Sequence, residues 1–186
     1  MNSVEKYFLR RRINKILKNS KREKKFLNWK EIKRILLLFD TKDHTDAQLF
    51  MKRLKRMSKK VKVCAYKNKN DKNEYSEILY EVVTEKDFNF WKNDSLKKTV
   101  DSLNSESYDL AINLTLQDNL FLQYLLVSVD ATFRVGFCKT NLPIYDMVLS
   151  FSSEMETNKI ITIRDLSKQM IYYLETISSG NIKIKK

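Results

Sequence analysis

The chain has 186 residues, of which 42% are hydrophobic and 11% aromatic, which suits one ordinary domain with an appendage and excludes collagen-like and disordered proteins. No apolar run approaches the roughly 20 residues of a membrane span, and we expect no secretory signal, because the first residues lack an uninterrupted apolar core. The net charge of +13 is uneven: residues 1–34 hold 13 basic side chains against 3 acidic ones and residues 71–186 hold 13 against 17, which suggests a polyanion or an anionic membrane surface as partner.

The first 33 residues are predicted to form a basic helical arm that precedes the rest of the chain. Its apolar residues fall at helical spacing and can gather on one broad side: Val4, Phe8, Ile13, Ile16 and Leu17. A basic amphipathic helix can bind nucleic acid, lie on a membrane or pack on its own domain, and the sequence leaves these alternatives open. The candidate polyanion-binding residues are Arg10, Arg11, Arg12, Lys15, Lys18, Lys21 and Arg22.

Residues 34–186 are predicted to form a single α/β domain. It begins with a continuous apolar run at 34–40, which is typical of a strand buried on both faces. The apolar residues of the helix that follows recur at intervals of three and four: Ala47, Phe50, Leu54 and Met57. A strand is predicted at 61–68. Because a strand, a helix and a strand with short connections make a βαβ unit, we expect these two strands to be parallel.

The same alternation continues to the end of the chain, with further strands predicted at 77–83, 108–114, 132–137 and 145–151. Asp118 is expected to cap the apolar helix that follows it. Thr162 and Asp165 have the spacing of a capping box at the start of the last helix, and Gly180 is expected to end that helix. The predicted fold is therefore an α/β three-layer sandwich with a mostly parallel, Rossmann-like sheet and a basic N-terminal helix.

Four polar residues lie at or just beyond the ends of two predicted strands: Asp40, Asp43, Asn113 and Asp118. Folds of this class bind ligands at the carboxyl ends of the strands, near the switch in strand order. These residues therefore mark a candidate strand-end crevice, provided that the two strands are parallel. Carboxylates can hold Mg²⁺, but helix capping explains Asp43 and Asp118 without a metal, and no metal site is predicted.

Several kinds of site are excluded by what the sequence lacks. The chain has two glycines, Gly136 and Gly180, so it contains neither a P-loop nor a dinucleotide-binding fingerprint. His44 is its single histidine, which excludes a metal site built from several histidines. Cys64 and Cys138 are predicted to be buried free thiols in a reducing cytoplasm. We therefore expect no cofactor, and no catalytic residue is identified.

Two resemblances follow from these residues. The run YDLAINLTLQDNLFLQYLLVSVDATFRVGF, residues 108–137, resembles the acceptor-side half of heptosyltransferase-type glycosyltransferases, in which a strand, a helix and an RIG-like strand occur in the same order. Over residues 4–178 the chain resembles a family of small bacterial proteins of unknown function, through ILLLFD, KVKVCAY, KDFNFW, ATFRVGF and DMVLSF. The second resemblance implies an α/β fold and a bacterial cytoplasm, and it brings no known active site.

The leading hypothesis is a non-catalytic α/β binding module whose basic arm contacts a polyanion, either RNA or DNA. The first alternative is a degenerate or partner-dependent glycosyltransferase-like domain that uses the strand-end crevice. The second alternative is peripheral membrane attachment through the N-terminal helix. The three hypotheses require, in turn, an exposed Arg10–Arg12 cluster, an open crevice at Asp40 and Asp118, and an apolar helix side that is free of the core.

Overall fold

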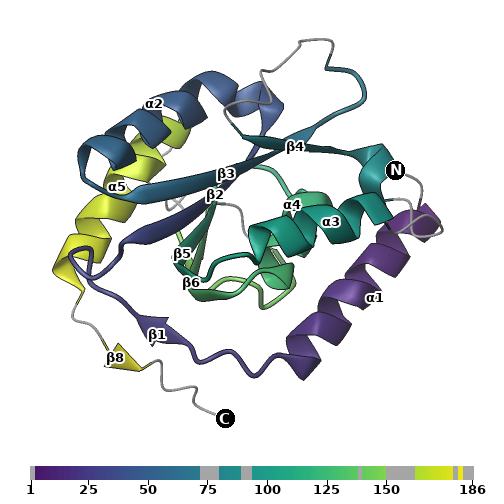
Figure 1. The fold of residues 1–186 in the computed structure, drawn as a ribbon, viewed down its shortest axis with the longest axis horizontal. Helices are drawn as coiled ribbons and strands as arrows, with labels where there is room; N and C mark the ends of the chain where they lie inside the picture. The colour runs from purple at the N-terminus through teal and green to yellow at the C-terminus, as the bar shows by residue number, and fades with distance from the viewer. Residues whose placement is uncertain are drawn as a thin grey trace, which may run out of the picture.

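The computed structural model describes residues 3–71, 80–88, 94–137, 140–149, 162–177 and 180–181. Its centre is a six-stranded sheet with the order β4-β3-β2-β5-β6-β7, in which every neighbouring pair is parallel. The strands are β2 (Arg34–Asp40), β3 (Lys60–Lys67), β4 (Glu81–Thr84), β5 (Tyr108–Asn113), β6 (Ala131–Gly136) and β7 (Met147–Val148). Helices cover both faces of this sheet (Figure 1), so the predicted Rossmann-like α/β sandwich is confirmed.

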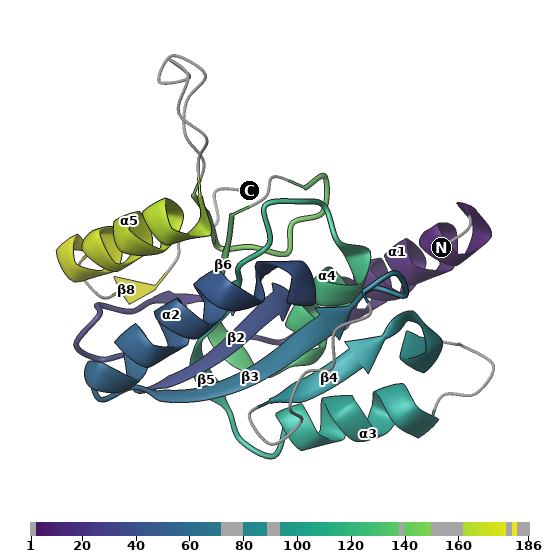
Figure 2. The same cartoon turned by 90° about the horizontal axis from the view of Figure 1, so that it is seen from above.

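The helices form one layer on each side of the sheet (Figure 2). One layer consists of α2 (His44–Arg56) and α5 (Ile163–Thr176), and the other of α1 (Ser3–Asn19), α3 (Asp94–Leu103) and α4 (Leu120–Ser128). The central strand β2 serves both cores, since Leu37 and Phe39 pack with α2 and α5 while Leu36 and Leu38 pack with α4. A strand that is covered on both faces buries its side chains on both sides, which explains why its sequence is apolar from Ile35 to Phe39.

The α1 helix is docked on α4 rather than free. Leu9 and Ile13 are fully buried in the core that contains α4, and they form the centre of the packing side. The predicted apolar side is wrong at Val4 and Phe8, which are 61% and 49% exposed. Each residue turns an α-helix by about 100°, which places Val4 and Phe8 roughly opposite Ile13.

Three apolar residues between α1 and β2, Leu27, Trp29 and Ile32, are also buried. Leu27 and Trp29 lie in the core on the α2 and α5 side of the sheet, next to the short strand β1 (Lys25–Phe26). The first 33 residues therefore contribute to both cores. The division of the chain into an arm and a separately folding domain at residue 34 stays a prediction about independent folding.

The ends of two helices differ from what the sequence suggested. Thr162 and Asp165 form the predicted capping box of α5, but this helix ends at Thr176, and Ile177 is already extended. Gly180 pairs with Phe26 in β8 (Gly180–Asn181), so the prediction that it ends the helix is wrong. The cap of α4 is Asn119, whose side-chain oxygen accepts from the backbone N–H groups of two residues in the first turn, rather than the predicted Asp118.

Two further sequence features have a structural explanation. Cys64 is a buried free thiol, as predicted, while Cys138 lies outside the described residues. A Cβ atom on Gly136 would lie 2.3 Å from the ring of Tyr145, so β6 needs a glycine where that ring crosses it. The Tyr145 hydroxyl in turn accepts a 2.8 Å hydrogen bond from the Asn113 side chain at the end of β5.

Candidate functional site

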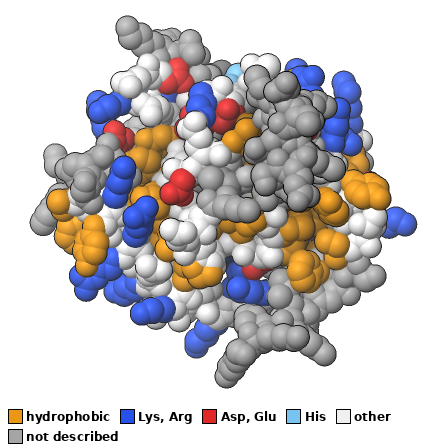
Figure 3. Space-filling model, turned by 180° about the vertical axis from the view of Figure 1, so that it is seen from behind, with side chains coloured by type: hydrophobic (Ala, Val, Ile, Leu, Met, Phe, Trp, Pro, Cys, Tyr) orange, Lys and Arg blue, Asp and Glu red, His pale blue; other side chains and the backbone are white. Residues whose placement is uncertain are grey.

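One candidate site is the exposed side of α1, which we call the α1 surface. It consists of Val4, Tyr7, Phe8, Arg10, Arg11, Lys15 and Lys18. Its first turns are apolar and aromatic, and the rings of Tyr7 and Phe8 meet edge to face with centroids 5.8 Å apart. Its later turns are basic. In Figure 3, hydrophobic and basic side chains lie side by side along the left edge, where α1 lies in this view.

The structure places the predicted polyanion-binding residues in three different environments. Arg10, Arg11, Lys15 and Lys18 are exposed on α1, and Lys21 is exposed just beyond its end. Arg12 is half-buried and has a partner of its own. Arg22 lies elsewhere altogether, because its guanidinium is turned inward and paired.

Arg22 fixes the segment after α1 to the edge of the sheet. Its Nη1 and Nη2 atoms each donate a 2.7 Å hydrogen bond to the carboxylate of Asp146, and Nη1 also donates to the Thr132 carbonyl at 2.9 Å. The Asp146 side chain is 1% exposed and accepts a further bond from the Arg134 backbone N–H. Because Arg22 is occupied in this way, we leave it out of the proposed binding surface.

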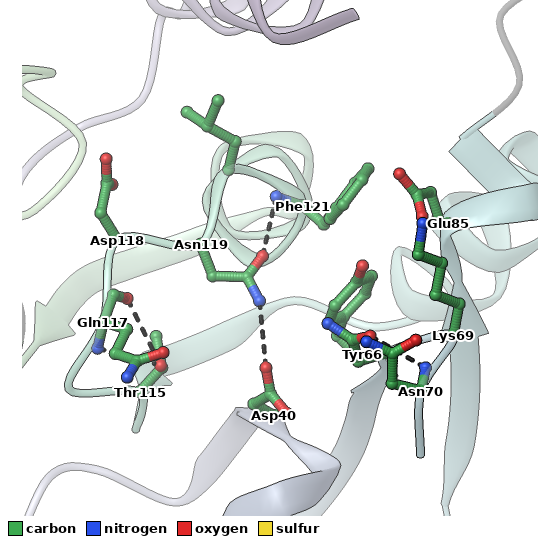
Figure 4. Close-up of a pocket in the computed structure, with 12 residues that line it drawn as sticks. Asp40, Tyr66, Lys69, Asn70, Glu85, Thr115, Gln117, Asp118, Asn119 and Phe121 are labelled. Carbon is green, nitrogen blue, oxygen red and sulfur yellow. Dashed lines mark hydrogen bonds between the residues drawn. The ribbon is translucent and has the colours of Figure 1, made fainter. Parts of the chain in front are cut away.

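A second candidate site lies where the strand order reverses. The sheet grows outward from β2 through β3 and β4 on one side and from β5 through β6 and β7 on the other, so the switch point lies between β2 and β5. Open α/β sheets bind ligands at this point, beyond the carboxyl ends of the strands. A polar crevice of about 280 Å³ is present at the carboxyl ends of β2, β3 and β5 (Figure 4), and its lining includes Asp40, Tyr66, Asn68, Thr115, Asn119 and Phe121.

Only part of the predicted crevice set comes together there. Asp40 and Asp118 both line the crevice. Asn113 is fully buried beside it and bonds to Tyr145, while Asp43 lies at the start of α2 and does not line the crevice. The sequence reasoning missed Tyr66 and Asn68. The predicted parallel pairing of the first two strands could have indicated them, because the carboxyl end of β3 then lies at the same edge of the sheet as that of β2.

Asn119 connects the two sides of the switch point. Its side-chain oxygen caps α4, and its side-chain nitrogen donates a 3.4 Å hydrogen bond to Asp40 at the end of β2. Asp40 also accepts from the Lys42 backbone N–H at 3.2 Å. In Figure 4 the Asp118 carboxylate points away from Asp40, and it accepts a hydrogen bond from Gln123 instead.

Asp43 carries a buried carboxylate oxygen that has no hydrogen-bond partner among the residues that the structure describes. Burial raises the pKa of Asp43 from 3.8 to about 6, while Lys42 lowers it and Asp40 and Asp46 raise it. Between pH 3.8 and about pH 6, Asp43 is protonated in the folded protein but ionised in the unfolded chain. The stability that this proton contributes is fully present below about pH 4 and is lost as the pH rises through about 6.

We therefore expect Asp43→Asn to stabilise the protein at neutral pH by roughly 1 kcal/mol, after discounting for the half-exposed position of the side chain. The advantage should vanish below about pH 4, where the native carboxyl is protonated in both states. Urea unfolding of both proteins at neutral and acidic pH measures this difference. A variant that is no more stable than the native protein at neutral pH would contradict the explanation.

Two further properties bear on what these sites can do. Among the residues that the structure describes, no three His, Cys, Asp or Glu side chains are grouped so that they could hold a metal ion. None of the described helices combines the length and the apolar composition that crossing a membrane requires.

Comparison with known proteins gives one match. The model of a family of unknown function, DUF6913, matches residues 5–177. No curated protein and no solved structure matches the chain. The resemblance to a family of unknown function is confirmed, whereas the likeness to heptosyltransferases, the bacterial origin and the cytoplasmic location stay predictions.

Proposed function

The chain belongs to the family of unknown function DUF6913, and we propose that it is a nucleic-acid-binding module that contacts RNA or DNA through the α1 surface. The observation that carries this proposal is the way α1 is docked. Leu9 and Ile13 face α4, so the basic residues Arg10, Arg11 and Lys15 are held outward on a fixed helix. Four exposed cations on one rigid element can neutralise successive phosphates without the entropy cost of ordering a free arm.

The aromatic half of the α1 surface supports the same partner. Tyr7 and Phe8 are exposed beside Arg11, and nucleic acids that are single-stranded offer bases for stacking next to phosphates for pairing. The segment as a whole carries 13 basic against 3 acidic residues up to residue 34, so its potential attracts polyanions from a distance.

A membrane surface fits the same helix less well. A helix that lies in a membrane interface buries a continuous apolar side along its length. Here the long apolar side, centred on Leu9 and Ile13, is already covered by α4, and only the first turns of the exposed side are apolar. We therefore favour nucleic acid, and the glycosyltransferase-like alternative stays a prediction.

Binding of labelled mixed-sequence RNA and DNA, followed by fluorescence anisotropy at low salt, tests the proposal. The α1 charge variant replaces Arg10, Arg11, Lys15 and Lys18 with glutamine, and we expect it to bind on the order of 100-fold more weakly, because four phosphate contacts are lost. The matched α2 charge variant replaces Lys52, Arg53, Lys55 and Arg56, which are exposed on the opposite side of the sheet. Both variants remove two arginines and two lysines, so equal losses would show that only net charge matters and would contradict a specific surface.

A further inference from the structure

We propose that the crevice at the switch point binds a small neutral ligand that carries hydroxyl groups on a ring, as a sugar or a nucleoside does. This site is separate from the α1 surface, because no residue of that surface lines the crevice. Its volume of about 280 Å³ lies at the lower end of the range for small-molecule pockets, so the ligand should be no larger than one or two rings.

The charges of the lining disfavour an anion. The lining contains three carboxylates, those of Asp40, Glu85 and Asp118. Among the residues that the structure describes, Lys69 is the one cation in this lining. The start of α4 cannot cradle a phosphate either, since the Asn119 side chain already occupies the N–H groups of Phe121 and Leu122 at 3.0 and 3.3 Å. A ligand that donates hydrogen bonds and carries no negative charge fits such a lining.

Tyr66 offers a hydroxyl group to a ligand in the crevice. Tyr66 is 4% exposed, yet its hydroxyl bonds to none of the residues that the structure describes. Its ring is stacked on Phe121 with centroids 4.7 Å apart, which fixes its direction, and Figure 4 shows the hydroxyl facing the opening between Asn119 and Glu85. Burial raises the pKa of Tyr66, so the hydroxyl stays protonated and can both donate and accept. The hydroxyl oxygen is not one of the buried side-chain atoms that lack a partner in the described part of the chain, so it keeps access to the crevice, where a ligand can bond to it.

Asp40 supplies the matching acceptor. Asp40 is 8% exposed, and from the described residues its carboxylate receives two long hydrogen bonds, at 3.2 and 3.4 Å, from Lys42 and Asn119. A carboxylate can accept about four hydrogen bonds, so two positions remain for a ligand. Two neighbouring hydroxyls of one ring can donate to the two oxygens of a single carboxylate. The amide groups of Asn68 and Asn70 and the hydroxyl of Tyr66 then serve the remaining ring substituents.

The test is an NMR titration of the full-length protein, labelled with ¹⁵N, in which the amide signals of Asn119 and Phe121 are followed. The probes are galactose and glucose for free sugars, adenosine and uridine for nucleosides, inorganic phosphate for anions and putrescine for cations. We expect saturable shifts at these amides with at least one hydroxylated ring, and the responding pair identifies the source. Phosphate and putrescine should produce none.

Asp40→Asn should weaken that binding by about 10-fold or more, because a charged acceptor is replaced by a neutral one. Asparagine keeps the oxygen that accepts from Lys42, so the fold should be retained. Asn70→Trp, at an exposed position on the rim, should block the crevice without touching the core. Asp101→Asn, on the exposed side of α3, is the matched control and should leave binding unchanged. Absence of saturable binding by all four hydroxylated probes, binding of putrescine or phosphate instead, or binding that Asp40→Asn leaves intact would overturn the proposal.

Discussion

Replacing Arg22 with methionine is expected to lower the free energy of unfolding by about 3–5 kcal/mol, because it leaves a buried carboxylate without its main partner. The Asp146 side chain is 1% exposed and accepts two 2.7 Å hydrogen bonds from the Arg22 guanidinium. Methionine fills much of the same space, so the change removes the charge but little packing. Lys24, whose ammonium nitrogen lies 3.7 Å from Asp146, compensates in part and places the effect toward the lower end.

Urea unfolding measures this loss. The matched control is Lys21→Met, which removes the same charge from an exposed neighbouring position and should change stability by no more than about 0.5 kcal/mol. The double variant Arg22→Met with Asp146→Leu should recover part of the loss, because no buried charge is then left unpaired. If Arg22→Met is as stable as Lys21→Met, the ion pair contributes nothing and Arg22 returns to the set of candidate binding residues.

The second large effect concerns the aromatic rings of the α1 surface. Replacing both Tyr7 and Phe8 with alanine should weaken binding of single-stranded RNA and DNA by about 2–6 kcal/mol, because stacking contributes about 1–3 kcal/mol per base. Duplex binding should change little, since duplex bases are already stacked and the cations of α1 remain. Both side chains are exposed, so their removal should leave the fold intact.

The control for this prediction exchanges the two rings. Tyr7→Phe combined with Phe8→Tyr keeps both aromatic faces and should bind single strands as the native protein does. Anisotropy titrations with a single-stranded oligonucleotide and its duplex compare the three proteins directly. Equal losses for single strand and duplex would show that the rings do not stack on bases. If the native protein binds anionic vesicles but no nucleic acid, the α1 surface binds membranes instead of RNA or DNA.

The elements of the fold that could be predicted are those whose signals are local. The strand at 34–40 is apolar from Ile35 to Phe39 because both of its faces are covered, and the structure gives it the predicted bounds. The capping box of α5 follows from two residues three positions apart. By contrast, Asp118 and Asn119 are equally good caps, and the sequence does not indicate that α4 begins directly after Asn119.

What could not be predicted depends on partners that are distant in the sequence. Arg22 belongs to a basic run, and nothing near it indicates that Asp146, 124 residues away, will take its charge. The docked side of α1 differs from the predicted one, because the hydrophobic residues Val4 and Phe8 are exposed and lie on the side of the helix away from Ile13. Asp40 and Asp118 line the crevice at the switch point, and the binding role predicted for them stays a prediction. Tyr66 lies in the lining because β3 pairs with β2, which no local sequence signal indicates.

The most direct test of nucleic-acid binding through the α1 surface is the salt dependence of affinity. Each phosphate neutralised contributes about −0.9 to the slope of log K against log salt on duplex DNA and about −0.7 on single strands. Four contacts from Arg10, Arg11, Lys15 and Lys18 predict a slope of about −3 to −4 for the native protein. The α1 charge variant should lose about 3 units of that slope and the α2 charge variant almost none. A native slope near zero, or a slope that the α1 variant leaves unchanged, would contradict the proposed function.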